Sequence, residues 1–318
     1  MPEVAPHAWA QRFQHEARFY SGLDEFLAAT VPFIRAGLDG DEPTLVAVPH
    51  PQLDALAGEL RADLDRVELL DMSVLGRNPA HLIPAWQDFL NRNAGGGRPV
   101  RGVGESIWAG RAHADVAECQ RHEALLNVAF AHMGEWKLLC PYDADALSGD
   151  IIDEAARTHP WVGDGCRERR QSTGCRALET MAAHCGLPLP PVPAGVASFP
   201  FGVDAIGSVR DFCARMARAN GLEGYRVDDL ILAVHELASN SVRHAGGHGV
   251  LRMWRDGDRI LCEVADEGHI DAPLAGRQRP VPDRLGGRGL WMANQLCDLV
   301  QIRTNADGNV VRLHQRLV

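Results

Sequence analysis

The clearest hydrophobic periodicity in the chain lies between residues 228 and 244. Its apolar side chains recur every three or four residues, the spacing of one buried helical face. They are Leu230, Ile231, Val234, Leu237, Ala238 and Val242. Glu236 and Asn240 are four residues apart and therefore lie on successive turns of one face, where neither belongs without a polar partner. The pattern predicts a core helix that presents a carboxylate and a carboxamide to something polar.

This pair suits a magnesium nucleotide. The amide oxygen of Asn240 is a hard ligand for the ion, and the Glu236 carboxylate can orient or deprotonate an attacking hydroxyl or water. The same spacing also occurs on solvated surface helices, so the pair alone leaves both interpretations open.

The first half of the chain alternates helical and strand patterns. Apolar runs predict strands at 44–48, 67–70, 100–105 and 137–140, and helical periodicity covers 23–38, 51–64, 79–93 and 112–132. This alternation predicts an α/β fold with a parallel, doubly wound sheet, which binds ligands beyond the carboxyl ends of its strands. Polar and aromatic residues near these ends form a candidate pocket: Glu105, Trp108, Arg111, His122, Tyr142 and Asp143. Caps and turns use the same residue types, so that alternative stays open.

A proline-rich segment at 186–195 divides the chain. It holds four prolines within six positions, which excludes a helix or a central strand. A charged stretch at 166–185, predicted to be helical, precedes it and is a candidate transmitter between domains. We therefore expect a first domain at 1–165, a linker at 166–195 and a second domain at 196–318.

The second domain is predicted to be a mixed sheet with helices on one side. Strand patterns occupy 197–201, 249–254, 260–265, 299–303 and 310–315, and helical patterns occupy 205–219 and 291–297 besides the core helix. Asp266-Glu267-Gly268 follows one strand, and a polar segment with prolines runs from 271 to 285. Gly286-Gly287-Arg288-Gly289 then opens the last helix, where glycines let backbone amides approach a phosphate.

Composition excludes several classes of function. A hydrophobic content of 46% with 23% charged residues is typical of a soluble globular protein. A net charge of -10 argues against direct DNA binding, which depends on basic residues. Without an apolar leader or a run of about 18 apolar residues, we expect a cytoplasmic protein without a membrane segment.

Cysteines and the single lysine exclude further sites. The eight cysteines include no Cys-x-x-Cys pair, so reduced thiols are expected. A metal site could be drawn from one group of residues, but their spacings match no common zinc module: His159, Cys166, Cys175, His184 and Cys185. Lys137 is not preceded by a glycine-rich loop, so a Walker-type phosphate loop is absent from the sequence.

Three motifs in a fixed order carry a family resemblance over 196–318. They are Glu236-x-x-x-Asn240, Asp266-x-Gly268 and Gly287-Arg288-Gly289. Together they resemble the Bergerat-fold site of the GHKL ATPases and kinases, and most closely that of the anti-sigma-factor serine kinases. The resemblance implies a two-layer α/β sandwich that binds ATP and Mg²⁺.

The resemblance also implies a role for each matching residue. Glu236 would be the catalytic base, Asn240 the magnesium ligand and Asp266, next to Gly268, the acceptor for the adenine amino group. The phosphates would lie against Gly287 and Gly289 with Arg288 as a charge partner, and 271–285 would be the lid. His244 fits the family pattern or caps the helix end. Ile270 departs from the pattern, because the family usually has glycine there.

Segments of the first half resemble the MEDS sensory domain, a relative of the RecA and KaiC folds. They are 15–20, 31–38, 104–111, 122–127 and 139–143, and the resemblance covers about 7–160. It implies a domain that senses a small molecule. The missing phosphate loop indicates that this ligand is not a nucleotide.

The two resemblances together imply a signalling regulator. The leading interpretation is an anti-sigma factor with ATP-dependent serine/threonine kinase activity on an antagonist protein, under control of the sensor domain. Its expected partners are a sigma factor, the antagonist and a second copy of the chain. Two alternatives stay open: a sensor histidine kinase with His122 as the acceptor, and a non-catalytic ATP-binding sigma antagonist, which the departure at Ile270 would favour.

Overall fold

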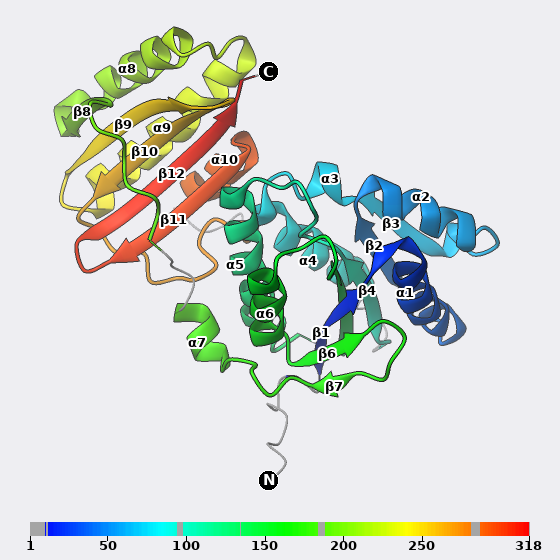
Figure 1. The fold of residues 1–318 in the computed structure, drawn as a ribbon. Coiled ribbons are helices and arrows are strands. Elements are labelled where there is room, and N and C mark those ends of the chain that lie inside the picture. The colour runs from blue at the N-terminus through cyan, green and yellow to red at the C-terminus, as the bar shows by residue number, and fades with distance from the viewer. Residues whose placement is uncertain are drawn as a thin grey trace. The chain divides into compact units, whose positions relative to one another are not determined.

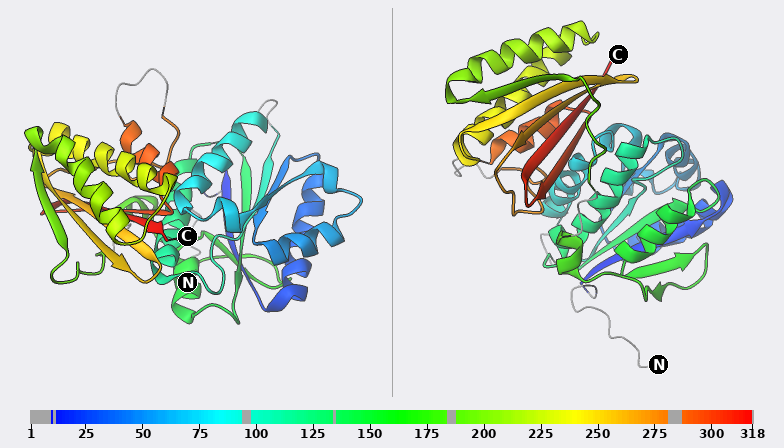
Figure 2. Two further views of the ribbon diagram at one scale, coloured as in Figure 1. Left: turned by 90° about the horizontal axis from the view of Figure 1, so that it is seen from above. Right: turned by 60° about the vertical axis from the view of Figure 1, so that its left-hand side comes forward.

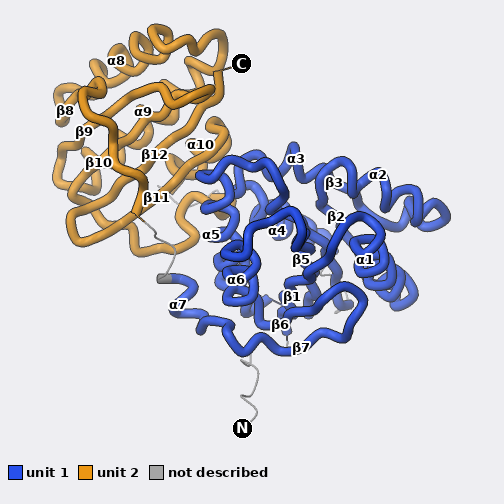
Figure 3. The backbone as a smooth tube through the Cα atoms, viewed as in Figure 1, with its two compact units in different colours: residues 1–185 blue, residues 186–318 orange. Residues whose placement is uncertain are grey.

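The computed structural model describes residues 10, 12–93, 98–133, 135–183, 188–280 and 287–317. The chain forms two compact units, residues 1–185 and 186–318 (Figure 3). The division falls inside the segment expected to be a linker. His184, Cys185, Gly286 and positions 281–285 of the expected lid lie outside the described residues.

Unit 1 is built on a seven-stranded sheet with the order β3-β2-β4-β5-β1-β6-β7 (Figure 1). The strands are β1 (Phe13–Tyr20), β2 (Thr44–Val48), β3 (Val67–Asp71), β4 (Val100–Gly104), β5 (Trp136–Asp143), β6 (Trp161–Asp164) and β7 (Arg170–Gln171). Neighbours from β3 to β6 pair in parallel, and β7 is antiparallel to β6. The predicted parallel sheet is confirmed, but strand β1, which lies between β5 and β6, was not predicted as a strand.

Helices cover both faces of this sheet (Figure 1). They are α1 (Gly22–Asp39), α2 (His50–Glu59), α3 (Met72–Leu75), α4 (Leu82–Asn93), α5 (His113–Phe130), α6 (Gly149–Thr158) and α7 (Leu178–Ala183), with 3-10 turns at Leu64–Arg66 and Pro79–His81. Side chains of α1 and α2 form one core with β2, β4 and Leu139 of β5. On the opposite face, Trp86 of α4 lies over Gly102 and Leu138, the neighbour of Leu139. Successive side chains of β5 thus point to opposite faces of the sheet and contribute to two separate cores.

The helix predicted for 166–185 is wrong over most of its length. Residues 166–177 form turns and β7, and only α7 is helical. Arg170 pairs with Val162 of β6, and the backbone N–H of Arg176 donates to the carbonyl of Arg157. The segment carries charged residues but no apolar stripe to hold a helix against the sheet, so edge pairing determines its structure.

Unit 2 contains a five-stranded sheet with the order β11-β12-β10-β9-β8. The strands are β8 (Ala197–Gly202), β9 (His248–Asp256), β10 (Arg259–Asp266), β11 (Leu299–Asn305) and β12 (Gly308–Arg316). Every neighbouring pair is antiparallel, so the mixed sheet expected from sequence is wrong. The tight turns of the hairpins β9–β10 and β11–β12 allow only antiparallel pairing. Longer connections join β8 to β9 and β10 to β12, and these pairs are antiparallel as well.

The α-helices in the described part of unit 2 lie on one face of this sheet (Figure 2). They are α8 (Ile206–Ala219), preceded by a 3-10 turn at Val203–Ala205, α9 (Tyr225–His244) and α10 (Arg288–Leu296). Leu230, Val234 and Leu237 of α9 pack into the same core as Leu251 and Val264 of the strands. The result is a two-layer α/β unit with α9 as its central buried helix. Among the described helices of the chain, none is both long and apolar enough to cross a membrane.

Candidate nucleotide site

Helix α9 places Glu236 and Asn240 at the border of the unit 2 core. Leu230, Val234 and Leu237 are at most 3% exposed, whereas Glu236 and Asn240 are only half-buried. The two polar side chains therefore flank the buried stripe, as their four-residue spacing requires.

Gly289 lies directly against this pair. A Cβ atom at this position would be 2.7 Å from Asn240 Nδ2 and 3.3 Å from Glu236 Oε2. Gly289 is buried and follows Arg288, the first residue of α10, whereas Gly287 before the helix is exposed and has a left-handed φ of 78°. The start of α10, where the first backbone N–H groups have no partner within the helix itself, thus lies beside the carboxylate and the amide only because Gly289 has no side chain.

The Asp266 carboxylate is fixed by three donors. Ser241 Oγ donates to Oδ2 over 2.6 Å, and Oδ1 accepts from the Gly268 N–H at 2.9 Å and from Asn309 Nδ2 at 3.2 Å. Each carboxylate oxygen has two lone pairs, so Oδ2 can accept one further donor. A Cβ at Gly268 would lie 2.7 Å from Cβ of Ala245, so this glycine is required by packing.

Two residues of this arrangement, Ser241 and Asn309, were missed from sequence. Asn309 is oriented by Thr304, whose Oγ1 donates to Asn309 Oδ1 at 2.6 Å. Gly308 has a φ of 126°, and a Cβ there would be 2.0 Å from the Asp266 carbonyl oxygen. Gly308 and Asn309 both lie in the Asn-Ala-Asp-Gly-Asn segment at 305–309, between the strands predicted at 299–303 and 310–315, and this composition is typical of a turn. The Asp-Gly-Asn composition indicates a turn, but no local sequence pattern indicates that this turn lies against Asp266.

The first part of the expected lid is held on α10. Asn294 Nδ2 donates to the carbonyl of Gly276 at 3.0 Å, and a Cβ at Gly276 would lie 2.8 Å from Cβ of Leu290. The Ala275 N–H donates to Ala272 within the same turn. Residues 272–277 therefore form a packed turn.

The remaining predicted site residues differ in their surroundings. Ile270 is half-buried against the hydrophobic core of unit 2, so the residue that departs from the family pattern has a packing function. Arg288 and His244 are exposed.

The donor set fits a magnesium nucleotide. Asn240 supplies an amide oxygen, Asp266 supplies an oriented acceptor for an amino group, and the space that a Cβ would fill at Gly289 adjoins Asn240 and Glu236. These are the groups that the ion, the base and the phosphates require.

The residues predicted to line a pocket in unit 1 fall into separate groups. Glu105 accepts a hydrogen bond from the Tyr20 hydroxyl at 2.8 Å, and burial raises the pKa of its carboxyl to about 8. Asp143 accepts the backbone N–H groups of Asp145 and Ala146 and so shapes a turn.

The other members of that predicted set have structural contacts. The Arg111 guanidinium lies 4.2 Å from the Trp108 ring centroid and donates to the carbonyl of Ser106. His122 and Tyr142 are buried, with exposed fractions of 0% and 2%.

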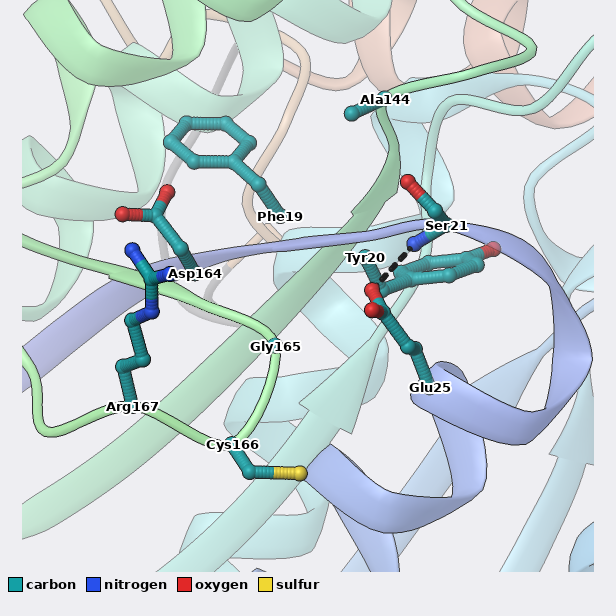
Figure 4. Close-up of a pocket in the computed structure, with 9 residues that line it drawn as sticks. All are labelled: Phe19, Tyr20, Ser21, Glu25, Ala144, Asp164, Gly165, Cys166 and Arg167. Carbon is teal, nitrogen blue, oxygen red and sulfur yellow. Dashed lines mark hydrogen bonds between the residues drawn. The ribbon is translucent and has the colours of Figure 1, made fainter.

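A cavity of about 550 Å³ lies at the carboxyl ends of β1 and β6, and none of the six predicted residues lines it (Figure 4). Its lining consists of Phe19, Tyr20, Ser21, Glu25, Ala144, Asp164, Gly165, Cys166 and Arg167. The Glu25 carboxylate accepts the Ser21 N–H at 2.8 Å. An aromatic ring, carboxylates, a guanidinium and a thiol thus surround a space at the strand ends, where parallel sheets bind ligands.

Comparisons with known proteins agree with the two units. Residues 14–160 match the family model of MEDS, the methanogen/methylotroph DcmR sensory domain, and residues 199–314 match that of the histidine kinase-like ATPase domain. The search of curated proteins gives no match. Among solved structures, the chain is similar to the crystal structure of the RsbU and RsbW domains of a Mycobacterium tuberculosis protein, with 17% identity and a TM-score of 0.29. The alignment covers 66% of this chain and 49% of that one, so the chain spans about half the length of this relative.

Proposed function

The chain joins an N-terminal MEDS domain to a C-terminal histidine-kinase-like ATPase domain, and from this premise we propose that it is an anti-sigma factor with ATP-dependent serine/threonine kinase activity. The pairing of a sensor domain with a kinase-like ATPase makes it a signalling regulator. Its proposed partners are a sigma factor, which it sequesters, and an antagonist protein, which it phosphorylates. The three ordered motifs of unit 2 support this assignment within the ATPase superfamily.

The approach of Gly289 to Glu236 and Asn240 carries the proposal. It brings a helix start, a carboxylate and an amide from separate parts of the chain to one place, with room that a single methyl group would remove. Phosphate groups favour helix starts, so the nucleotide phosphates would lie at the beginning of α10.

Each residue then has a separate task in phosphoryl transfer. Asp266 accepts a hydrogen bond from the amino group of the base, and Ser241 and Asn309 fix the orientation of the Asp266 carboxylate. Asn240 would hold the magnesium ion, which would supply charge stabilisation for the transferring phosphoryl group. Glu236 orients the acceptor hydroxyl and takes its proton.

The cavity at the ends of β1 and β6 is the proposed sensor site. Its polar and aromatic lining supports a small ligand that carries both polar and apolar groups (Figure 4). Binding of this ligand would change the kinase activity of unit 2. We also propose that the chain forms a homodimer, as kinases of this type commonly do.

The kinase assay uses the full chain, labelled ATP, Mg²⁺ and candidate antagonist proteins. Glu236→Gln is expected to bind ATP but to transfer no phosphate, because it keeps the shape of the side chain and loses the base. Glu223→Gln, an exposed position in the same unit, is the matched control and should keep full transfer. Undiminished transfer by Glu236→Gln would overturn the assigned role. ATP binding without transfer in the wild type would favour the non-catalytic antagonist.

Burial bears on the histidine kinase alternative. His122 is fully buried on α5, so a kinase cannot reach its ring in the folded protein. Acid-labile phosphate that disappears in His122→Gln would be needed to restore this alternative.

A further inference from the structure

Four side chains of three chemical types converge inside unit 1. They are His15 of β1, Glu123 of α5, Cys140 of β5 and His159, which follows α6. Their ligand atoms all lie within 4.8 Å of one another, and each residue is at most 3% exposed. The sheet order β5-β1-β6 brings them together from distant parts of the sequence (Figure 3).

The distances within this cluster match a tetrahedral metal site. His15 Nε2 is 3.3 Å from both Cys140 Sγ and Glu123 Oε2, which in turn lies 3.5 Å from His159 Nε2 and from Cys140 Sγ. Zinc bonds of about 2.0–2.3 Å at tetrahedral angles place ligand atoms roughly 3.3–3.8 Å apart. Four of the six ligand pairs therefore already have the required separation.

Hydrogen bonds at the far side of each ring determine which nitrogen is available. His159 Nδ1 lies 2.8 Å from the Ala155 carbonyl, which can only accept, so Nδ1 carries the hydrogen. His15 Nδ1 lies 2.9 Å from Asn127 Oδ1. The Asn127 amide cannot be flipped, because its Nδ2 donates to the Thr158 carbonyl at 2.9 Å.

Rings that carry the hydrogen on Nδ1 present their Nε2 atoms as the possible metal ligands. Both Nε2 atoms face Glu123 Oε2 inside the buried cluster. Lone pairs that converge in a buried site are stabilised by a positive charge among them, which a metal ion or a shared proton can supply.

We propose that His15, Glu123, Cys140 and His159 bind a divalent transition metal ion of the Zn²⁺ class. Two imidazoles, a carboxylate and a thiol form a borderline-soft donor set, which excludes Ca²⁺ and Mg²⁺ as preferred ions. Binding replaces the S–H bond of Cys140 with a metal–sulfur bond and releases the proton to solvent. The thiolate and the carboxylate then balance the two positive charges of the ion.

An outer layer of contacts orients the proposed ligands. Asn127 and the Ala155 carbonyl fix the two rings, and Ser106 Oγ donates to the second oxygen of Glu123. Metal-bound histidines normally have such partners. Four protein ligands and near-complete burial describe a closed site that stabilises the domain.

The first test measures metal directly on the full chain purified from a zinc-supplemented culture. We expect one ion per chain by mass spectrometry of the metal content. Cys140→Ser and His159→Gln should lose it, whereas Cys119→Ser, a buried thiol of α5 outside the cluster, should keep it. A folded wild-type chain without metal would overturn the proposal and indicate a cluster held by shared protons only.

Cobalt substitution keeps the proposal testable if the variants do not fold. The wild-type chain loaded with Co²⁺ should show intense tetrahedral d–d absorption in the visible range and a thiolate-to-cobalt band in the near ultraviolet. The thiolate band requires a cysteine ligand, so its absence from a cobalt-loaded chain would exclude Cys140 as a ligand and refute the assigned site.

Discussion

Substitution of Gly289 by alanine tests the architecture of the nucleotide site with one methyl group. The new Cβ would lie 2.7 Å from Asn240 Nδ2, closer than real Cβ contacts come. The end of the Asn240 side chain must therefore move by roughly 0.5–1 Å to reach ordinary contact distance. This movement displaces the amide from its place beside Glu236.

The expected loss concerns binding rather than folding. A hydrogen bond or ligand contact to a charged group contributes about 1.5–3 kcal/mol, so the dissociation constant for ATP with Mg²⁺ should rise about 10- to 150-fold. Stability should change little, because alanine is favoured over glycine within a helix by up to about 1 kcal/mol and this gain offsets the local clash.

Calorimetric titration of the full chain with ATP and Mg²⁺, together with thermal unfolding, measures both effects. Gly207→Ala is the matched control: Gly207 is the second residue of α8, as Gly289 is of α10, and its Cβ would meet no atom within 4 Å. The control should bind ATP normally. Wild-type affinity in Gly289→Ala would refute the reasoning that phosphates and ion share the space beside this glycine.

Three further changes test other contacts. Ser241→Ala removes the donor to Asp266 Oδ2, and calorimetry should show ATP affinity about fivefold weaker, the effect of about 1 kcal/mol; unchanged affinity would mean that this hydrogen bond does not orient the acceptor. Burial raises the pKa of Glu105 from 4.5 to about 8, so the folded chain keeps a proton that the unfolded chain loses. The free energy of unfolding should therefore fall between about pH 5 and 8, by up to about 5 kcal/mol, and urea titrations of Glu105→Gln should lack this part of the slope; equal slopes would contradict it. Gly308→Ala places a Cβ 2.0 Å from the Asp266 carbonyl oxygen. This clash should lower the free energy of unfolding by about 2–4 kcal/mol, measured by thermal melts. An unchanged melting temperature in the variant would contradict this prediction.

The elements of the fold were largely predictable where a periodic apolar face determines them. The helix predicted at 228–244 is α9, Tyr225–His244, and the strands predicted at 249–254 and 260–265 are β9 and β10. In these segments, residues that are close in the sequence determine the structure. The helix prediction for residues 166–177 was wrong because charged residues alone do not hold a helix against the sheet. Strand β7 is instead determined by its pairing with β6.

The contacts between distant segments were not predictable. Glu236 and Asn240 share a helix, so their spacing indicated a site, but the approach of Gly289 depends on how α10 packs on α9. The cluster around Glu123 combines residues separated by more than a hundred positions, since β1 pairs with β5 and so brings His15 to Cys140. Sequence spacing carries no information about such strand order.

The hydrogen bonds around Asp266 have a consequence for the energetics of the whole ATPase unit. Ser241 comes from α9, Asp266 from β10 and Asn309 from β12, so the acceptor is oriented only when all three elements are in place. A nucleotide that uses this acceptor would bind the native state and not the unfolded one. At a hundred times its dissociation constant it would add about 2.7 kcal/mol to the stability of the unit. The supply of ATP in the cell would then set how much folded regulator persists, as well as how fast it acts.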